Sequence, residues 1–144
     1  EIGHFNIKSN YIIHPGPTIG YRVTGNRSVF TYMPDHEPAL GGDGIITDSK
    51  WMSGFDLALK ADILYHDGQF TAEEYKTKKG WGHSSIADAL QYASLCKVEK
   101  ILLAHHDPAH SDEQLTKIFI NIQANYNELP KYEMAKEGSE IDLP

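Results

Sequence analysis

Residues 100–108 read KILLAHHDP, an apolar run that stops abruptly at two histidines, an aspartate and a proline. A short apolar run bounded by polar and turn-forming residues is typical of a buried strand. A second run, ADILYHD at residues 61–67, ends in His66 and Asp67 in the same way. Between the two, residues 85–96 place apolar side chains at helical spacing. We therefore expect an α/β fold in which a helix joins two buried strands with ionisable ends.

Two more predicted strands end in ionisable residues. Residues 5–13 form an extended stretch that stops at His14, and the proline after it disfavours a helical conformation there. Residues 28–32 form a strand that stops at a Met-Pro pair, which leaves Asp35 in the following loop. Functional side chains gather where strand ends bring loops together. The four strand ends are therefore expected to converge on one site.

The remaining segments complete one continuous α/β unit without a repeat or a linker. Thr71 with Glu74, and Ser111 with Gln114, form capping-box patterns that begin helices. The other expected elements are a strand at 20–23, a turn at 25–27, a glycine-rich loop at 39–49, a weak helix at 50–60 that Gly54 interrupts, a helical start within 71–79, a long helix from 111 to about 129, and a hairpin or last strand at 133–143.

Composition limits the class of protein. A chain of 144 residues with 40% hydrophobic and 23% charged residues has the balance of one globular domain. The net charge of −7 argues against a broad nucleic-acid-binding face, although not against a nucleotide substrate. Cys96 is the single cysteine, so no intrachain disulfide forms and a cytoplasmic location is expected. No apolar run approaches the roughly 20 residues of a membrane helix.

Histidine and carboxylate side chains at the strand ends indicate a metal site, because zinc, manganese and iron all accept these ligands. Taken singly, each residue has a plainer interpretation. His14 can be a hydrogen-bonded structural histidine, and Asp35 can cap the turn between its flanking prolines. His106 should point away from the site, because adjacent residues of a strand face opposite sides. The agreement of four strand ends favours the metal interpretation.

Five blocks of the sequence, in this order and spacing, resemble the ribonuclease Z-like branch of the metallo-β-lactamase superfamily. They are HPGPTIGYRV at 14–23, FTYMPDHEP at 30–38, ADILYHD at 61–67, GHSS at 82–85 and KILLAHHDP at 100–108. The family's His-x-His-x-Asp-His block is absent. The resemblance therefore implies that residues 1–144 are one unit, the carboxy-terminal half of an αββα sandwich, with a mixed sheet and flanking helices. The amino-terminal half is expected as a missing partner.

The resemblance also implies a role for each site residue. His14, Asp35 and His105 are expected to bind two divalent metal ions, with zinc first and manganese or iron as alternatives, and Asp35 would bridge them. His83 is expected to contact the scissile phosphate or to protonate the leaving oxygen, and Asp67 to orient either His83 or a metal-bound histidine. Asp67 stands where the branch commonly has glutamate, and His36 stands where threonine is common.

The function implied is that of a metal-dependent hydrolase. It would be a phosphodiesterase that cleaves a small cyclic or nucleotide phosphodiester with a hydroxide held between two metals. Nucleic acid is expected to be an unlikely partner, because the basic cluster at 76–79 follows an acidic pair. The chain alone is expected to be inactive and to expose an apolar sheet face, through which it could form a homodimer. The alternatives are thioester, lactone or β-lactam hydrolysis, di-iron redox chemistry, and a non-catalytic scaffold or sensor.

Overall fold

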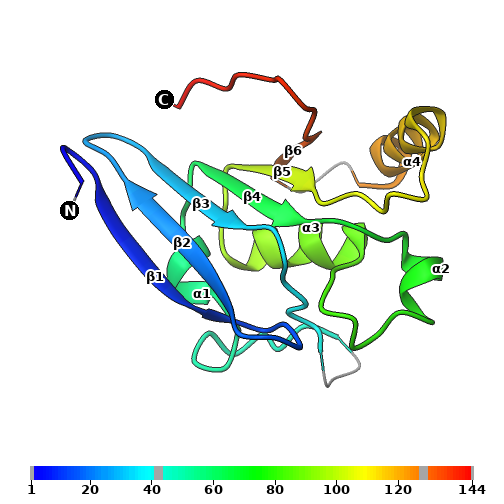
Figure 1. Ribbon diagram of the computed structural model, residues 1–144, viewed down its shortest axis with the longest axis horizontal. Helices are drawn as coiled ribbons and strands as arrows, with labels where there is room; N and C mark the ends of the chain where they lie inside the picture. The colour runs from blue at the N-terminus through cyan, green and yellow to red at the C-terminus, as the bar shows by residue number, and fades with distance from the viewer. Residues whose placement is uncertain (1, 41–43, 127–129, 144) are drawn as a thin grey trace.

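One six-stranded mixed sheet organises the protein (Figure 1). The structure is a computed structural model that describes residues 2–40, 44–126 and 130–143. The strands lie side by side in sequence order, antiparallel from β1 to β3 and parallel from β3 to β6. Their bounds are β1 Asn6–Ile12, β2 Thr18–Thr24, β3 Val29–Met33, β4 Ile63–Asp67, β5 Lys100–Ala104 and β6 Lys131–Met134. The helices are α1 Phe55–Ala58, α2 Ala72–Tyr75, α3 Ile86–Leu95 and α4 Asp112–Asn125.

The parallel strands bring the predicted functional residues to one edge of the sheet. Met33 pairs with His66, and Asp67 pairs with Ala104. The chain therefore leaves β3, β4 and β5 at neighbouring points, because the carboxyl ends of parallel strands meet at the same edge. This register makes the predicted convergence geometrically possible.

The hydrophobic core lies between the sheet and its helices. Leu90 of α3, Leu64 of β4 and Leu103 of β5 are fully buried within one cluster. Each such side chain stabilises the fold by about 1.5–3 kcal/mol relative to exposure in water. Ser85 caps α3 by accepting a hydrogen bond from Asp88 N at 3.0 Å, so the helix begins where its buried face begins.

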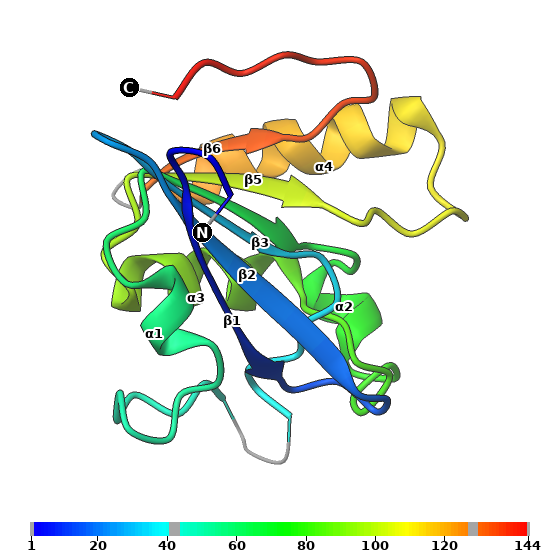
Figure 2. The same ribbon diagram turned by 60° about the vertical axis from the view of Figure 1, so that its left-hand side comes forward.

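The opposite face of the sheet is apolar and open. Figure 2 shows α1 and α3 together on one side of the sheet. On the other side, Tyr32 and Tyr65 stack with ring centroids 5.1 Å apart, and Tyr32 remains 40% exposed. Large apolar side chains of β1 and β2 are also exposed, namely Ile7, Tyr11, Ile19 and Tyr21. The structure thus contains the exposed apolar sheet face expected from the sequence.

Several elements differ from their sequence predictions. The helix predicted at 50–60 is reduced to α1, because Gly54 adopts a left-handed conformation with φ of 68°. For 133–143 the sequence predicted a hairpin or a last strand, and the structure has a last strand, β6, which is parallel to β5 and begins at Lys131. Both predicted capping boxes are confirmed, at the starts of α2 and α4. The predicted end of the long helix near Leu129 and part of the loop at 39–49, including Gly41 and Gly42, lie outside the described residues.

Candidate metal centre

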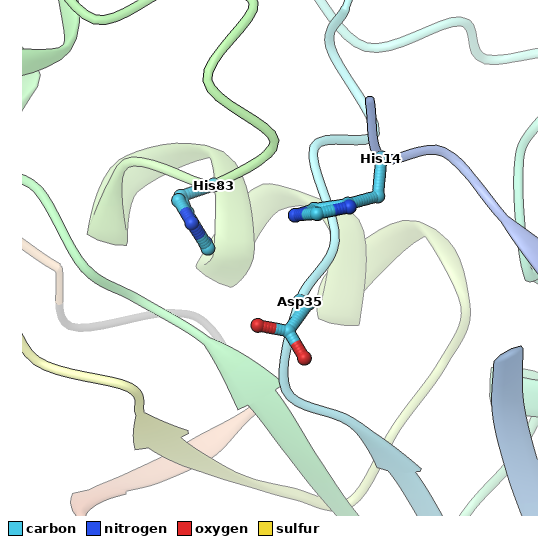
Figure 3. Close-up of side chains that lie close together, drawn as sticks. All are labelled: His14, Asp35 and His83. Carbon is cyan, nitrogen blue, oxygen red and sulfur yellow. The ribbon is translucent and has the colours of Figure 1, made fainter. Parts of the chain in front are cut away.

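Three predicted site residues meet at the carboxyl edge of the sheet. Figure 3 shows His14, Asp35 and His83 facing one another from three different segments. His14 follows β1, Asp35 follows β3, and His83 precedes α3. One ligand atom of each lies within 4.8 Å of the ligand atoms of the other two. Asp67, His83 and His105 form a second group by the same measure.

His105 connects the two groups. Its Nε2 lies 3.3 Å from Asp35 Oδ1, and its ring stacks on His83 with centroids 4.7 Å apart. The backbone of His105 is left-handed, with φ of 56°, a conformation that costs a residue with a side chain about 1 kcal/mol. Such outliers cluster at functional sites, where the surroundings hold them in place. Here the turn presents the ring to Asp35 instead of continuing β5.

Asp67 and His83 form a hydrogen-bonded pair beside these residues. Asp67 is fully buried, and its Oδ2 accepts a hydrogen bond of 2.6 Å from His83 Nδ1. Its Oδ1 accepts from Ser84 N and Gln69 N. The hydrogen bond to Asp67 raises the pKa of His83; partial burial opposes this, and the negative charges of Asp67 and Asp35 add to it. His83 therefore holds a proton more readily than a free imidazole does.

A close backbone approach brings the His83 loop against His14. Gly82 has φ of 97°, and a Cβ atom added there would lie 2.3 Å from His14 Cδ2 and 2.5 Å from Pro15 Cδ. Only glycine fits at this separation and in this backbone conformation. The glycine of the GHSS block thus allows the two site segments to touch.

The donor set of the cluster fits divalent metal ions. Imidazole nitrogens and carboxylate oxygens are the ligands that zinc, manganese and iron accept. His14, Asp35 and His105 offer these atoms just after β1, β3 and β5. The predicted triad is not itself one of the two groups of close ligand atoms, because His105 groups with Asp67 and His83 while His14 and Asp35 group with His83. A partly buried Asp35 among histidines is also a favourable place for a cation. The residues present therefore fit the metal chemistry predicted from the sequence.

Comparison with known proteins identifies the family. A family model described as "Beta-lactamase superfamily domain" matches residues 2–106. The chain belongs to the β-lactamase superfamily. The family resemblance inferred from the five sequence blocks is thereby confirmed.

Curated relatives of the chain include ribonucleases Z. The chain is 28% identical to ribonuclease Z of Enterococcus faecalis over 141 residues, which are 92% of this chain and 44% of that protein. It is 27% identical to ribonuclease Z of Salinibacter ruber over 135 residues, 90% of this chain and 37% of that protein. The chain therefore spans less than half the length of the curated relatives it matches.

Solved structures confirm the metallo-β-lactamase fold. The human tRNase Z short form matches with a TM-score of 0.69 and 20% identity, over 100% of this chain and 44% of that one. The metallo-β-lactamase fold protein YhfI of Bacillus subtilis matches with a TM-score of 0.67 and 21% identity, over 96% of this chain and 50% of that one. Among the described residues, no helix of this superfamily member is long and apolar enough to span a membrane.

A buried pair of histidines links the segments that carry the candidate ligands, and the sequence did not indicate that these two histidines form a pair. His36 Nδ1 and His66 Nε2 are 2.9 Å apart, and both rings are fully buried. His66 Nδ1 must donate to the carbonyl of Asp67, so His66 Nε2 accepts from His36 Nδ1. His36 Nε2 then accepts from Ser53 Oγ, which itself accepts from Ile13 N. This chain of hydrogen bonds fixes the segments that carry His14, Asp35 and Asp67.

The histidine pair should make the protein sensitive to acid. Burial lowers the pKa of His36, with a further contribution from His66, and burial also lowers the pKa of His66. Both rings stay neutral when folded and take up protons near pH 6.5 when unfolded. Their contribution to stability is therefore complete above about pH 6.5 and is lost as pH falls, at about 1.4 kcal/mol per pH unit for each proton. Urea unfolding of metal-free protein between pH 7.5 and 5.5 should show this loss.

His83 supplies the control for this prediction. Its folded-state pKa is raised, so its contribution is complete below its unfolded pKa and is lost as pH rises through the folded value. His83→Ala should therefore leave the loss of stability below about pH 6.5 unchanged, and it should remove only the gain that His83 gives as pH falls from its folded pKa to about 6.5. Unfolding free energy that stays constant or increases down to pH 5.5 would contradict the prediction.

A buried carboxylate was also not recognised from the sequence. Glu37 is fully buried, and its carboxylate accepts hydrogen bonds from Tyr75 Oη at 2.8 Å, Gly80 N at 2.8 Å and Gly82 N at 2.6 Å. Burial and the hydrogen bond to Glu37 raise the pKa of Tyr75. The loop before His83 is thus anchored to the residue two positions after Asp35.

The other two histidines near the site lie apart from the candidate metal ligands. His106 is half-buried, and neither of its ring nitrogens has a hydrogen-bond partner among the described residues. His110 Nε2 lies 2.7 Å from Glu74 Oε1, so this histidine joins the start of α2 to the start of α4. Neither belongs to the two groups of potential ligands found in the described residues.

Proposed function

We propose that the full-length protein is a metal-dependent phosphodiesterase in which His14, Asp35 and His105 bind the metal ions. The observation that carries the proposal is the position of Asp35, which is 3.3 Å from His105 Nε2 and within 4.8 Å of a His14 nitrogen. Zinc is the first candidate, and manganese and iron accept the same ligands. When bound, such ions lower the pKa of water and stabilise negative charge on a phosphate.

His83 is proposed to act on the phosphodiester itself. Asp67 accepts a hydrogen bond from His83 Nδ1. The other ring nitrogen, Nε2, is therefore the atom that can donate a proton to a phosphate oxygen or to the leaving oxygen. The raised pKa of His83 keeps this proton available near neutral pH. Asp67 holds the ring in position and is itself held by Ser84 N and Gln69 N.

We also propose that the site is completed by a second half-domain packed on the open sheet face. Two features support this: the face exposes large apolar side chains such as Tyr11 and Tyr32, and the chain covers 44% of the Enterococcus faecalis relative. The three ligands of this chain cannot complete the shells of two metal ions. Residues 1–144 alone should therefore be inactive. Homodimerisation through the same face is the competing arrangement.

The substrate class is a phosphodiester, and two sizes of substrate have support. The net charge of −7 favours a small phosphodiester over a long polyanion. The relatives, in contrast, are named ribonuclease Z, which favours RNA, and they do not support the expectation that nucleic acid is an unlikely partner. A small phosphodiester and an RNA should therefore both be tested as substrates.

The test is hydrolysis of bis(p-nitrophenyl) phosphate by the full-length protein loaded with zinc or manganese. Turnover should fall at least roughly 100-fold after chelation and return when the metal is restored, because the bound ions stabilise the developing charge. A 2′,3′-cyclic nucleotide and a folded transfer RNA precursor should then be compared as natural substrates.

Other outcomes would support the alternative functions. Hydrolysis of a thioester or lactone, without phosphodiester turnover, would identify an acyl hydrolase. Two bound metals without hydrolysis of either class would favour redox chemistry. Neither metal nor turnover would identify a scaffold or sensor.

A further inference from the structure

The loop that precedes His83 displays a tryptophan on a fixed backbone. Gly80 N and Gly82 N, on either side of Trp81, both donate to the buried carboxylate of Glu37. Trp81 N donates to the carbonyl of Lys78 at 3.1 Å. The backbone of Trp81 is therefore held on both sides, yet its side chain is 57% exposed. An indole that is exposed and also fixed in position is suited to binding a ligand.

A lysine orients this indole. Lys78 Nζ lies 4.1 Å from the centroid of the Trp81 ring and 5.5 Å from that of Phe70. The Phe70 ring in turn packs edge-on against His83, with centroids 6.3 Å apart. Cation–π contacts of this kind hold a ring in one orientation and leave positive charge beside it. These side-chain contacts run without a break from the exposed Trp81, through Lys78 and Phe70, to His83 in the site.

The tryptophan is also close to the metal centre along the chain. Gly82 packs directly against the His14 ring, and His83 lies between the two groups of potential ligands. Two residues of extended chain span at most about 7 Å, so the backbone of Trp81 lies within that distance of His83. A phosphate bound at His83 would therefore place its substituents near Trp81.

We propose that Trp81 and Lys78 form a stacking platform for a nucleobase of the phosphodiester substrate. The proposal rests on the proposed function, which it narrows to substrates that carry a base. An exposed aromatic ring with an adjacent cation is how proteins bind bases regardless of sequence, because every base has a π-face and every nucleotide is anionic. Lys78 would attract a phosphate while Trp81 stacks on the base.

The kinetic test compares two substrates with the same leaving group in the full-length protein. Thymidine 5′-monophosphate p-nitrophenyl ester carries a base, and methyl p-nitrophenyl phosphate does not. Trp81→Ala should raise KM for the thymidine ester roughly tenfold and change kcat less than twofold, because stacking acts on binding. Both constants for the methyl ester should stay within twofold, and Trp81→Phe should restore part of the loss.

Trp51 supplies the matched control, since it is the other tryptophan, is 74% exposed and lies outside the site loops. Trp51→Ala should leave both substrates unaffected. If Trp81→Ala changes KM equally for the two esters, or for neither, the platform is absent.

A binding measurement separates the platform from the hydrolase proposal. In the full-length protein, the fluorescence that Trp81 contributes is the difference between wild type and Trp81→Phe. This part of the fluorescence should be quenched by adenosine 5′-monophosphate but not by ribose 5-phosphate. Quenching without any turnover would support the platform and reject the phosphodiesterase. Turnover without quenching would support the phosphodiesterase and reject the platform. Fluorescence that changes with protein concentration instead of nucleotide would assign Trp81 to self-association and overturn the platform.

Discussion

Asp35→Ala in the full-length protein is expected to lower kcat/KM for bis(p-nitrophenyl) phosphate at least roughly 1,000-fold, or about 4 kcal/mol of transition-state stabilisation. Asp35 is the carboxylate that faces His105 at 3.3 Å and shares a cluster with His14 and His83. Without it, His14, His83 and His105 lose the carboxylate that lies close to all three. Metal content by mass spectrometry should fall together with activity.

The control for Asp35 is Asp112→Ala, which removes an exposed carboxylate from the first turn of α4. This variant should keep both its metal and its activity. Asp35→Asn adds a further comparison, because it keeps the side chain's shape and removes its charge. An Asp35→Ala protein that retains two metals and at least a tenth of wild-type activity would show that other groups carry the reaction.

Glu37→Leu is expected to lower the free energy of unfolding by about 3–5 kcal/mol. The substitution leaves three donors without their acceptor, namely Tyr75 Oη, Gly80 N and Gly82 N, and of these residues Tyr75 and Gly82 are buried. Each buried donor without a partner costs about 1–3 kcal/mol. Domains of this size have only about 5–15 kcal/mol in total, so the effect is a large share of it. Urea unfolding monitored by circular dichroism measures the difference.

Two variants divide the Glu37 effect into its parts. Tyr75→Phe removes one donor and leaves both loop amides bonded, so it should cost only about 1 kcal/mol. Glu37→Gln keeps the size but presents an NH₂ group to one of the donors, and it should fall between the other two. A Glu37→Leu protein within 1 kcal/mol of wild type would mean that water or a rearranged loop satisfies the freed donors.

Local patterns in the sequence predicted most of the fold. The strands ending at Met33, Asp67 and Ala104 were predicted from apolar runs that stop at polar residues, and the helix starts from capping residues such as Ser111. These signals are local, since a cap or a run of buried residues lies within a few positions of chain. The family was likewise predicted from short blocks in a fixed order, and the match over residues 2–106 confirms it.

Long-range contacts explain what the sequence did not predict. Glu37 accepts hydrogen bonds from residues 38 to 45 positions away, and His36 bonds to a ring 30 positions away. Neither residue carries a local pattern that separates a buried acceptor from a surface charge. The helix at 50–60 was predicted to be weak and interrupted by Gly54; the left-handed conformation of this glycine limits the helix to the single turn of α1. The roles of the metal ligands remain predictions for the experiments above.

Three consecutive residues after β3 serve three separate parts of the protein. Asp35 belongs to the candidate metal centre, His36 belongs to the buried histidine pair, and Glu37 accepts hydrogen bonds from the loop before His83. An insertion or deletion of one residue in this segment would move all three at once, whereas a substitution affects one. We therefore expect homologous chains to tolerate changes of length in the exposed stretch at 46–51 but not between positions 33 and 38. In a library of single-codon deletions, deletions of Asp35, His36 or Glu37 should be tolerated least.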